Sequence, residues 1–233
     1  MMWMFKRGIG ALLMAGMLVG CSSQGESDSF STQIFGSLKE AVTTRREGPR
    51  PKIVVTPEML AQTTIAALQV NPEVRGGSDF LRRVAARNDS SLGTVEIWNS
   101  SDNAQVFLRN GVVVGTRGIG GDIIAADANV TVRALQNRSG ANGVRTYTIS
   151  DGDVTTTEYR LRCDLRDMGS ERISVVNLVF NAEHIQENCV GGPTGDTVIQ
   201  NDYWVQHTTG LVRKSRQWMG PKTGYFEFVL LKD

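Results

Sequence analysis

The sequence predicts a mainly β fold: an antiparallel meander curled into a barrel or half-barrel, with two short N-terminal helices packed on it. From residue 79 onward, stretches rich in Val, Ile, Thr and Tyr alternate with polar residues, as in strands that bury one face. Turn signals separate these stretches, many of them roughly 10 to 15 residues apart, which is typical of hairpins. About ten or eleven strands are predicted, a number that usually curls a sheet.

The predicted turns are rich in Asn, Asp, Ser and Gly, the residues that tolerate turn backbones. They are Asn88-Asp89, Ser101-Asp102-Asn103, Asn110-Gly111, Ser139-Gly140, Asp151-Gly152-Asp153, Met168-Gly169-Ser170, Thr209-Gly210 and Pro221-Lys222-Thr223-Gly224.

Two helices are predicted before the strands. Residues 31–42, "STQIFGSLKEAV", carry apolar residues near helical spacing. A second helix begins with Thr56 as its cap and Pro57 at its first position, and its apolar spacing continues through Leu68 until Asn71-Pro72 stops it. The helices would cover an open face of the sheet or plug its cavity.

The first residues read as a secretory signal. Lys6 and Arg7 precede the apolar run "GIGALLMAGMLVG", which is too short to span a bilayer comfortably. The run ends in Leu18-Val19-Gly20-Cys21, which resembles the lipobox of bacterial lipoproteins. This resemblance implies cleavage before Cys21, a diacylglycerol on its thiol and an acylated (palmitate-bearing) amino terminus. The alternative is an ordinary signal peptide with a chance cysteine.

The expected organisation is a signal peptide over 1–20, a lipidated tether over 21–31 and one β-rich periplasmic domain over 32–233. Acyl chains on Cys21 would make a firm anchor, because two chains already suffice for stable attachment. Ser22 stands where an aspartate would signal retention in the inner membrane, so we expect the periplasmic face of the outer membrane of a Gram-negative bacterium. The mature chain keeps 23 basic and 24 acidic residues, which leaves no basic field for nucleic acid.

Two cysteines remain after lipidation, Cys163 and Cys189. In an oxidising periplasm we expect them to form a disulfide, and two buried free thiols are the alternative. A metal site is not expected, because the chain has only His184 and His207 and the Cys/His spacing fits no zinc pattern. No cofactor is expected either.

The stretch "GVVVGTRGIGGDII", residues 111–124, raises the question of a phosphate loop. Such a loop needs a strand before it and a helix after it. Both flanks here, including "DIIAADANVTVRAL", read as strand, and no Gly-Lys-Ser/Thr follows. We therefore interpret the glycines as a corner that needs positive φ or a bulge.

Two groups of residues resemble the signature of the YjbF/GfcB family of lipoproteins of the group 4 capsule system. The first group is a Trp-x-Ser-x-Asp turn, an Asn-Gly hairpin and a Thr-x-Gly step, here Trp98, Ser100, Asp102, Asn110, Gly111, Thr116 and Gly118. The second lies near the carboxyl end: Tyr203, Trp204, Ser215, Arg216, Gln217 and Pro221. Asn103 and Ile119 depart from the commoner glycine and leucine. The resemblance covers most of the mature chain and implies a role beside capsule or exopolysaccharide export components at the outer membrane. It carries over no catalytic residue.

Possible ligand or partner contacts are aromatic or basic. Trp98, Trp204 and Trp218 are possible stacking surfaces for sugars, with core packing as the alternative. Arg117, beside the glycines, and Arg216, in the basic stretch "LVRKSRQW", are possible contacts to an acidic polymer or lipid, with a solvated strand face as the alternative.

No carboxylate pair or Gly-x-Ser-x-Gly context indicates a catalytic site, so we expect no enzyme. The leading hypothesis is an outer-membrane lipoprotein that assists assembly or export of capsule polysaccharide or exopolysaccharide. It would act through protein partners, including an outer-membrane β-barrel, and possible contact with the polysaccharide itself is kept open. The alternative is a carrier that holds a glycan or lipid in a half-barrel cavity.

Overall fold

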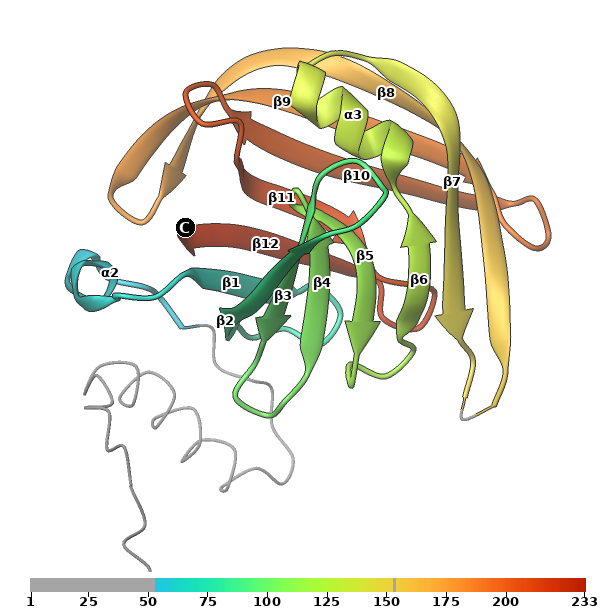
Figure 1. The fold of residues 1–233 in the computed structure, drawn as a ribbon, viewed down its shortest axis with the longest axis horizontal. Helices are drawn as coiled ribbons and strands as arrows, with labels where there is room; N and C mark the ends of the chain where they lie inside the picture. Colours follow the sequence, from blue (N-terminus) through green and yellow to red (C-terminus); the bar gives the residue numbers. More distant parts are fainter. Residues whose placement is uncertain (1–52, 153) are drawn as a thin grey trace, which may run out of the picture.

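Twelve antiparallel strands form one sheet that curls into a nearly closed barrel (Figure 1). The protein is seen here as a computed structural model that describes residues 53–152 and 154–233. The predicted β fold is confirmed. The signal peptide, Cys21, the tether 21–31 and the predicted helix over 31–42 lie outside the described residues.

The sheet is a meander whose two halves meet at the chain ends. Its hydrogen-bonded order is β5-β4-β3-β2-β1-β12-β11-β10-β9-β8-β7-β6, so the first strand pairs with the last. The strands are β1 (Ala67–Pro72), β2 (Asp79–Asn88), β3 (Thr94–Asn99), β4 (Gln105–Arg109), β5 (Val112–Arg117), β6 (Ile123–Asp127), β7 (Ala141–Ser150), β8 (Thr156–Val175), β9 (Leu178–Gly191), β10 (Thr197–Gln206), β11 (Val212–Trp218) and β12 (Tyr225–Lys232).

The barrel closes where β5 and β6, the two ends of this order, come together. The Thr116 hydroxyl of β5 accepts a hydrogen bond from the Ile123 amide of β6 at 2.9 Å. At this seam a side chain thus supplies a hydrogen bond between the two end strands of the sheet.

The predicted helix after residue 56 is correct at its start and wrong at its end. Helix α2 (Pro57–Gln62) begins at the expected cap, where the Thr56 hydroxyl accepts from the Met59 amide at 3.3 Å. Residues beyond 66 instead form β1, because pairing with both β2 and β12 buries Leu68 and Val70 on one face. The i, i+4 spacing that favoured a helix to Leu68 is overridden by these distant strands.

The stretch "DIIAADANVTVRAL" was predicted as strand, and only its first part is one. After β6 the chain enters helix α3 (Asn129–Asn137) and leaves it through Arg138 in the left-handed conformation. The helix buries Thr131, Val132, Ala134 and Leu135, which share one face, and packs against β7 and β9 (Figure 1). Its β-branched residues resemble strand composition, but their spacing is helical.

The long β8–β9 hairpin leaves the barrel wall and curls over its outside. The predicted turn at Met168-Gly169-Ser170 is instead an irregularity within β8, where the register shifts and Gly169 takes φ +94°. Beyond it, Val175 at the hairpin tip packs with Phe80 and Leu231 of the barrel exterior to form a small second core. The bulge therefore bends a strand that the sequence suggested would end there.

Candidate functional site

The inner face of the barrel carries an ion pair. Arg145 Nη1 of β7 lies 2.6 Å from Glu187 Oε2 of β9, and the two side chains are 1% and 0% exposed. Burial opposes the charge on Arg145, but the Glu187 carboxylate together with Tyr147 and Tyr203 outweighs it, so the pKa of the guanidinium lies above its ordinary value. Burial also raises the pKa of Tyr203, which keeps this neighbouring phenol neutral.

The groups around this pair come from several elements of the barrel and from α3. Glu187 accepts from Asn201 Nδ2 of β10 at 2.7 Å and from the Thr131 hydroxyl of α3. Arg145 donates to the Val113 carbonyl of β5 at 3.0 Å. The network therefore ties α3 and the seam strand β5 to the opposite wall.

Gln217 of β11 completes the link to β5. Its amide oxygen accepts from the Val113 amide at 2.8 Å, and its nitrogen donates to the Gly111 carbonyl at 2.8 Å. Gly111 has φ +83°, and a β-carbon there would lie 2.6 Å from Val212, so the Asn-Gly turn fits against the far wall only as glycine. The signature residues Gly111 and Gln217 thus link the β4–β5 turn to β11.

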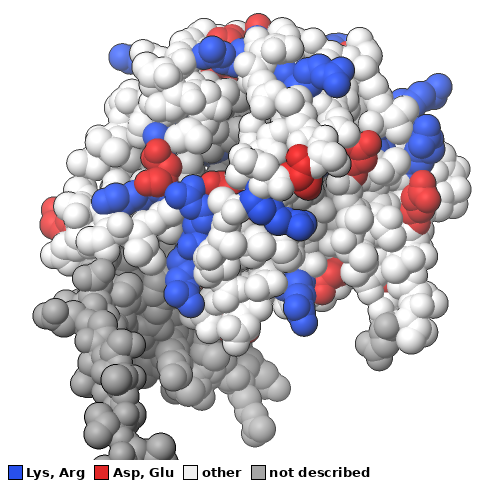
Figure 2. Space-filling model, viewed as in Figure 1, with Lys and Arg blue, Asp and Glu red and all other residues white. Residues whose placement is uncertain are grey.

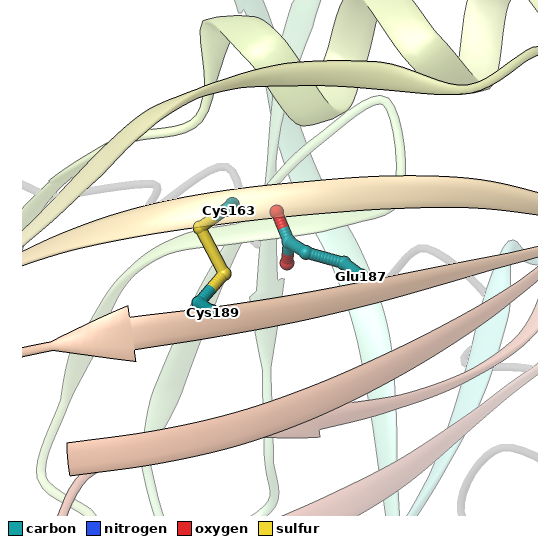
Figure 3. A group of neighbouring side chains, drawn as sticks. All are labelled: Cys163, Glu187 and Cys189. Atoms are coloured by element: carbon teal, nitrogen blue, oxygen red, sulfur yellow. A yellow bond between two sulfur atoms is a disulfide. The ribbon is translucent and has the colours of Figure 1, made fainter. Parts of the chain in front are cut away.

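The predicted disulfide is confirmed. Cys163 and Cys189 are directly opposite each other on β8 and β9 and are bonded. Figure 3 shows the Glu187 carboxylate beside this bond, with ligand atoms of the three residues within 4.8 Å of one another. Both sulfurs are used by the disulfide and the carboxylate by Arg145 and Asn201, so this trio acts as a crosslink beside an ion pair.

The glycine stretch binds a carboxylate of its own chain. Asp122 accepts from the Gly118 amide at 2.8 Å and the Ile119 amide at 3.1 Å, and from the Thr116 hydroxyl at 3.2 Å. Gly118, like its two following glycines, has positive φ. The amides that a phosphate would need are therefore occupied by Asp122, and the interpretation as a corner holds.

A cleft opens at this end of the barrel, where Ser100, Asp102 and Gly118 of the first signature group lie. Its volume is about 80 Å³, less than the ~150 Å³ cavity that holds benzene. The cleft admits a short aliphatic side chain rather than a lipid or a glycan. Its lining combines an apolar floor with a polar rim: Val70, Pro72, Arg75, Asp79, Leu81, Ser100, Asp102, Ala104, Val106, Gly118, Ile119 and Phe226.

Trp204, a predicted contact, stands on the outer face of β10, but both faces of its ring are covered. His184 stacks on it at 4.6 Å between ring centroids, and the Lys214 ammonium lies 5.4 Å from its centre. The register places these neighbours on the strands to either side. The indole therefore offers no open face to a sugar ring.

The same site holds the curled hairpin against the wall. His184 Nδ1 lies 2.9 Å from Glu171 of β8, and Nε2 lies 2.9 Å from Asp202 of β10. Trp204 Nε1 donates to Glu171 at 2.8 Å and, as the largest cause, lowers the pKa of that carboxyl. Both ring nitrogens of His184 are therefore engaged by carboxylates, and the contacts join β8, β9 and β10.

Arg216, the second predicted contact on this face, is paired. Its guanidinium donates to Glu73 at 2.6 Å and lies 3.7 Å from the Tyr225 ring centre, and the Glu73 hydrogen bond raises the pKa of Arg216. Lys214 pairs with Glu227 at 2.7 Å. Acidic and basic side chains are likewise interspersed on the face drawn in Figure 2. These pairings favour a solvated strand face over a polyanion site.

The remaining predicted contacts are spread apart. Trp98 is 1% exposed and Trp218 6% exposed; both belong to the core, and Trp218 meets Tyr147 edge-on. Core packing, the alternative kept for both, is what the geometry favours. Arg117 is exposed at the end of β5, next to Gly118 of the cleft.

Sequence reasoning missed the ion pair, although a signal was present. Glu187 is in phase with Ile185 and Cys189 on β9, and Arg145 is in phase with Tyr147 on β7. Strand alternation therefore placed both charges on the inner face.

The chain matches a known protein family and resembles a solved structure. The family described as "Group 4 capsule polysaccharide lipoprotein gfcB, YjbF" matches residues 27–231. The fold is similar to that of the hypothetical lipoprotein YmcC from Escherichia coli (K12), with a TM-score of 0.65 and 18% identity over 86% of this chain and 96% of that one. Comparison with curated protein sequences gives no match. Within residues 53–152 and 154–233, no helix has the length and apolar character needed to cross a membrane. With residues 27–231 of 233 matched, this protein belongs to the YjbF family of group 4 capsule polysaccharide lipoproteins.

Proposed function

We propose that this protein is anchored at Cys21 in the outer membrane, faces the periplasm, and assists assembly or export of a surface polysaccharide through protein partners. The observation that carries the proposal is the family match over residues 27–231, which spans the barrel and both signature groups.

A role in contacting partners agrees with the filled interior of the barrel. Trp98, Tyr147, Tyr203 and Ile185 are almost fully buried there, together with the Arg145–Glu187 pair. This packing argues against the alternative of a glycan or lipid carried inside the barrel. Partners would therefore bind at the outer surface or at the loop end, which is the end of the barrel that carries the glycine corner and the cleft.

We further propose that the protein works without catalysis of its own. A serine hydrolase needs a histidine with one ring nitrogen on the serine and the other on the acid. His207 instead meets both Ser170 and Glu183 through Nε2, at 3.5 and 2.9 Å. Both nitrogens of His184 face carboxylates.

The loop-end cleft is the proposed contact with a partner. Its apolar floor and its Arg75, Asp79 and Asp102 rim fit an aliphatic side chain flanked by polar groups. Ala104 lines the cleft at its half-buried rim, so Ala104→Trp would fill it.

The test is complementation of a deletion strain under conditions that induce the polysaccharide. Wild type and the control Val198→Trp, at an exposed position of β10, should restore surface polysaccharide, and Ala104→Trp at equal protein level should not. Normal polysaccharide in the deletion strain itself would refute the proposed function. Full complementation by Ala104→Trp would refute the role of the cleft.

A further inference from the structure

The chain enters the described domain at the tip of the β8–β9 hairpin. Ile53 and Val55, among the first described residues, pack with Val175, Val176 and Phe180 in the small second core. Figure 1 shows the hairpin tip, α2 and the start of β1 on one side of the barrel. Only 31 residues separate Cys21 from Ile53. The chain that leads from the anchor therefore joins the domain on this side of the molecule.

The hairpin tip exposes apolar side chains at that place. Val54 is 77% exposed, Val179 63% and Leu178 46%. Val176 takes φ +56°, a conformation that disfavours β-branched residues. The turn Val176-Asn177 thus keeps one apolar residue at a position whose backbone favours Gly or Asn.

The charges in the hairpin tip and in the sequence that precedes Ile53 fit an anionic surface. The tip, residues 172–182, contains one arginine and no acid. The connector 44–52, "TRREGPRPK", contains four basic residues and one acid. Apolar residues beside basic ones are the composition that binds anionic bilayer surfaces.

We infer that the β8–β9 hairpin tip, with Leu178 and Val179, rests in the interface of the bilayer that holds the acyl chains of Cys21. The inference rests on one part of the proposed function, the lipid anchor at Cys21. It also orients the barrel. The second core includes Ala67 at the start of β1, whereas the cleft includes Pro72 at its end, ~17 Å away at about 3.3 Å per residue. The cleft is then held away from the membrane, open to a periplasmic partner.

Tryptophan quenching by brominated lipids tests this orientation. The lipidated full chain carrying Val179→Trp would be reconstituted into vesicles of phosphatidylethanolamine and phosphatidylglycerol, with and without bromine on the acyl chains. The matched control is Val198→Trp, which is 73% exposed and pairs with Val190, eleven residues from Val179 along β9. Wild type, with its native tryptophans, gives the baseline.

The expected result is that the emission added by Val179→Trp is blue-shifted and lost in brominated vesicles, while that added by Val198→Trp is unchanged. Equal emission of Val179→Trp in both vesicles, with the protein still floating with the lipid, would overturn the inference and leave the anchor intact. Failure of wild type to float with vesicles would overturn the anchor and the inference together. Quenching of both variants alike would overturn the orientation.

Discussion

Removing the charge of Glu187 should destabilise the barrel more than any surface change. Glu187→Gln keeps the side-chain shape but removes the negative charge facing Arg145, which is 1% exposed. The guanidinium would keep the Val113 carbonyl and the Tyr203 hydroxyl, at 3.0 and 3.2 Å, but no counter-charge. Leaving one buried charge uncompensated costs about 3–5 kcal/mol, so we expect the free energy of unfolding to fall by that amount.

The assay is urea unfolding of the purified lipoprotein with the disulfide intact, followed by tryptophan fluorescence. Glu158→Gln on β8, an exposed position, is the matched control and should shift the free energy of unfolding by about 0.5 kcal/mol or less. The double variant Arg145→Met with Glu187→Leu should cost less than the sum of its single changes, because no unpaired charge remains. A loss below about 1 kcal/mol for Glu187→Gln would refute the reasoning, since it would mean that water solvates the pair.

Three further predictions concern the loop end, acid stability and the crosslink. Asp122→Ala leaves two amides of the glycine corner without their acceptor, and urea unfolding should show a loss of about 1–3 kcal/mol; unchanged stability would mean that the corner holds itself. The Arg109 and Ser91 hydrogen bonds lower the pKa of Asp89 to about 2, so its stabilising effect is complete above the unfolded pKa of about 4 and is lost as the pH falls through about 2. Asp89→Asn should therefore be less stable than wild type at pH 7 and equal to it near pH 2, and a constant difference would contradict this. Replacing both Cys163 and Cys189 by Ala should cost about 3–4 kcal/mol in urea unfolding, because the disulfide closes a loop of 26 residues; a loss near zero would contradict the entropic account.

Local features could be predicted from the sequence, and distant pairings could not. Alternation and turn residues predicted the β meander and turns such as Asn110-Gly111, because each signal lies within a few residues. The prediction of a helix through Leu68 was wrong because residues 67–72 pair as strand β1 with β12, which comes from the other end of the chain. Helix α3 was missed because Val130, Thr131 and Val132 have strand composition.

For the candidate site, the sequence likewise predicted which side chains face outward but not which partners they have. Trp204 and Arg216 do lie on the outer surface, as their strand phase required. Arg216 pairs with Glu73 in the turn after β1, and Trp204 stacks on His184 of β9, so neither group is free. The cleft joins loops that lie far apart in sequence, so no single motif revealed it.

Crosslinking from the cleft in intact cells tests the central claim most directly. A photoreactive amino acid at position 104 would be activated in capsule-producing cells, with position 198 as the control and Cys21→Ser to remove the anchor. We expect a protease-sensitive adduct to another envelope protein at position 104 that is absent from both controls. An adduct that resists protease and is removed by polysaccharide-degrading enzymes would contradict it, because the cleft would then bind the polymer itself.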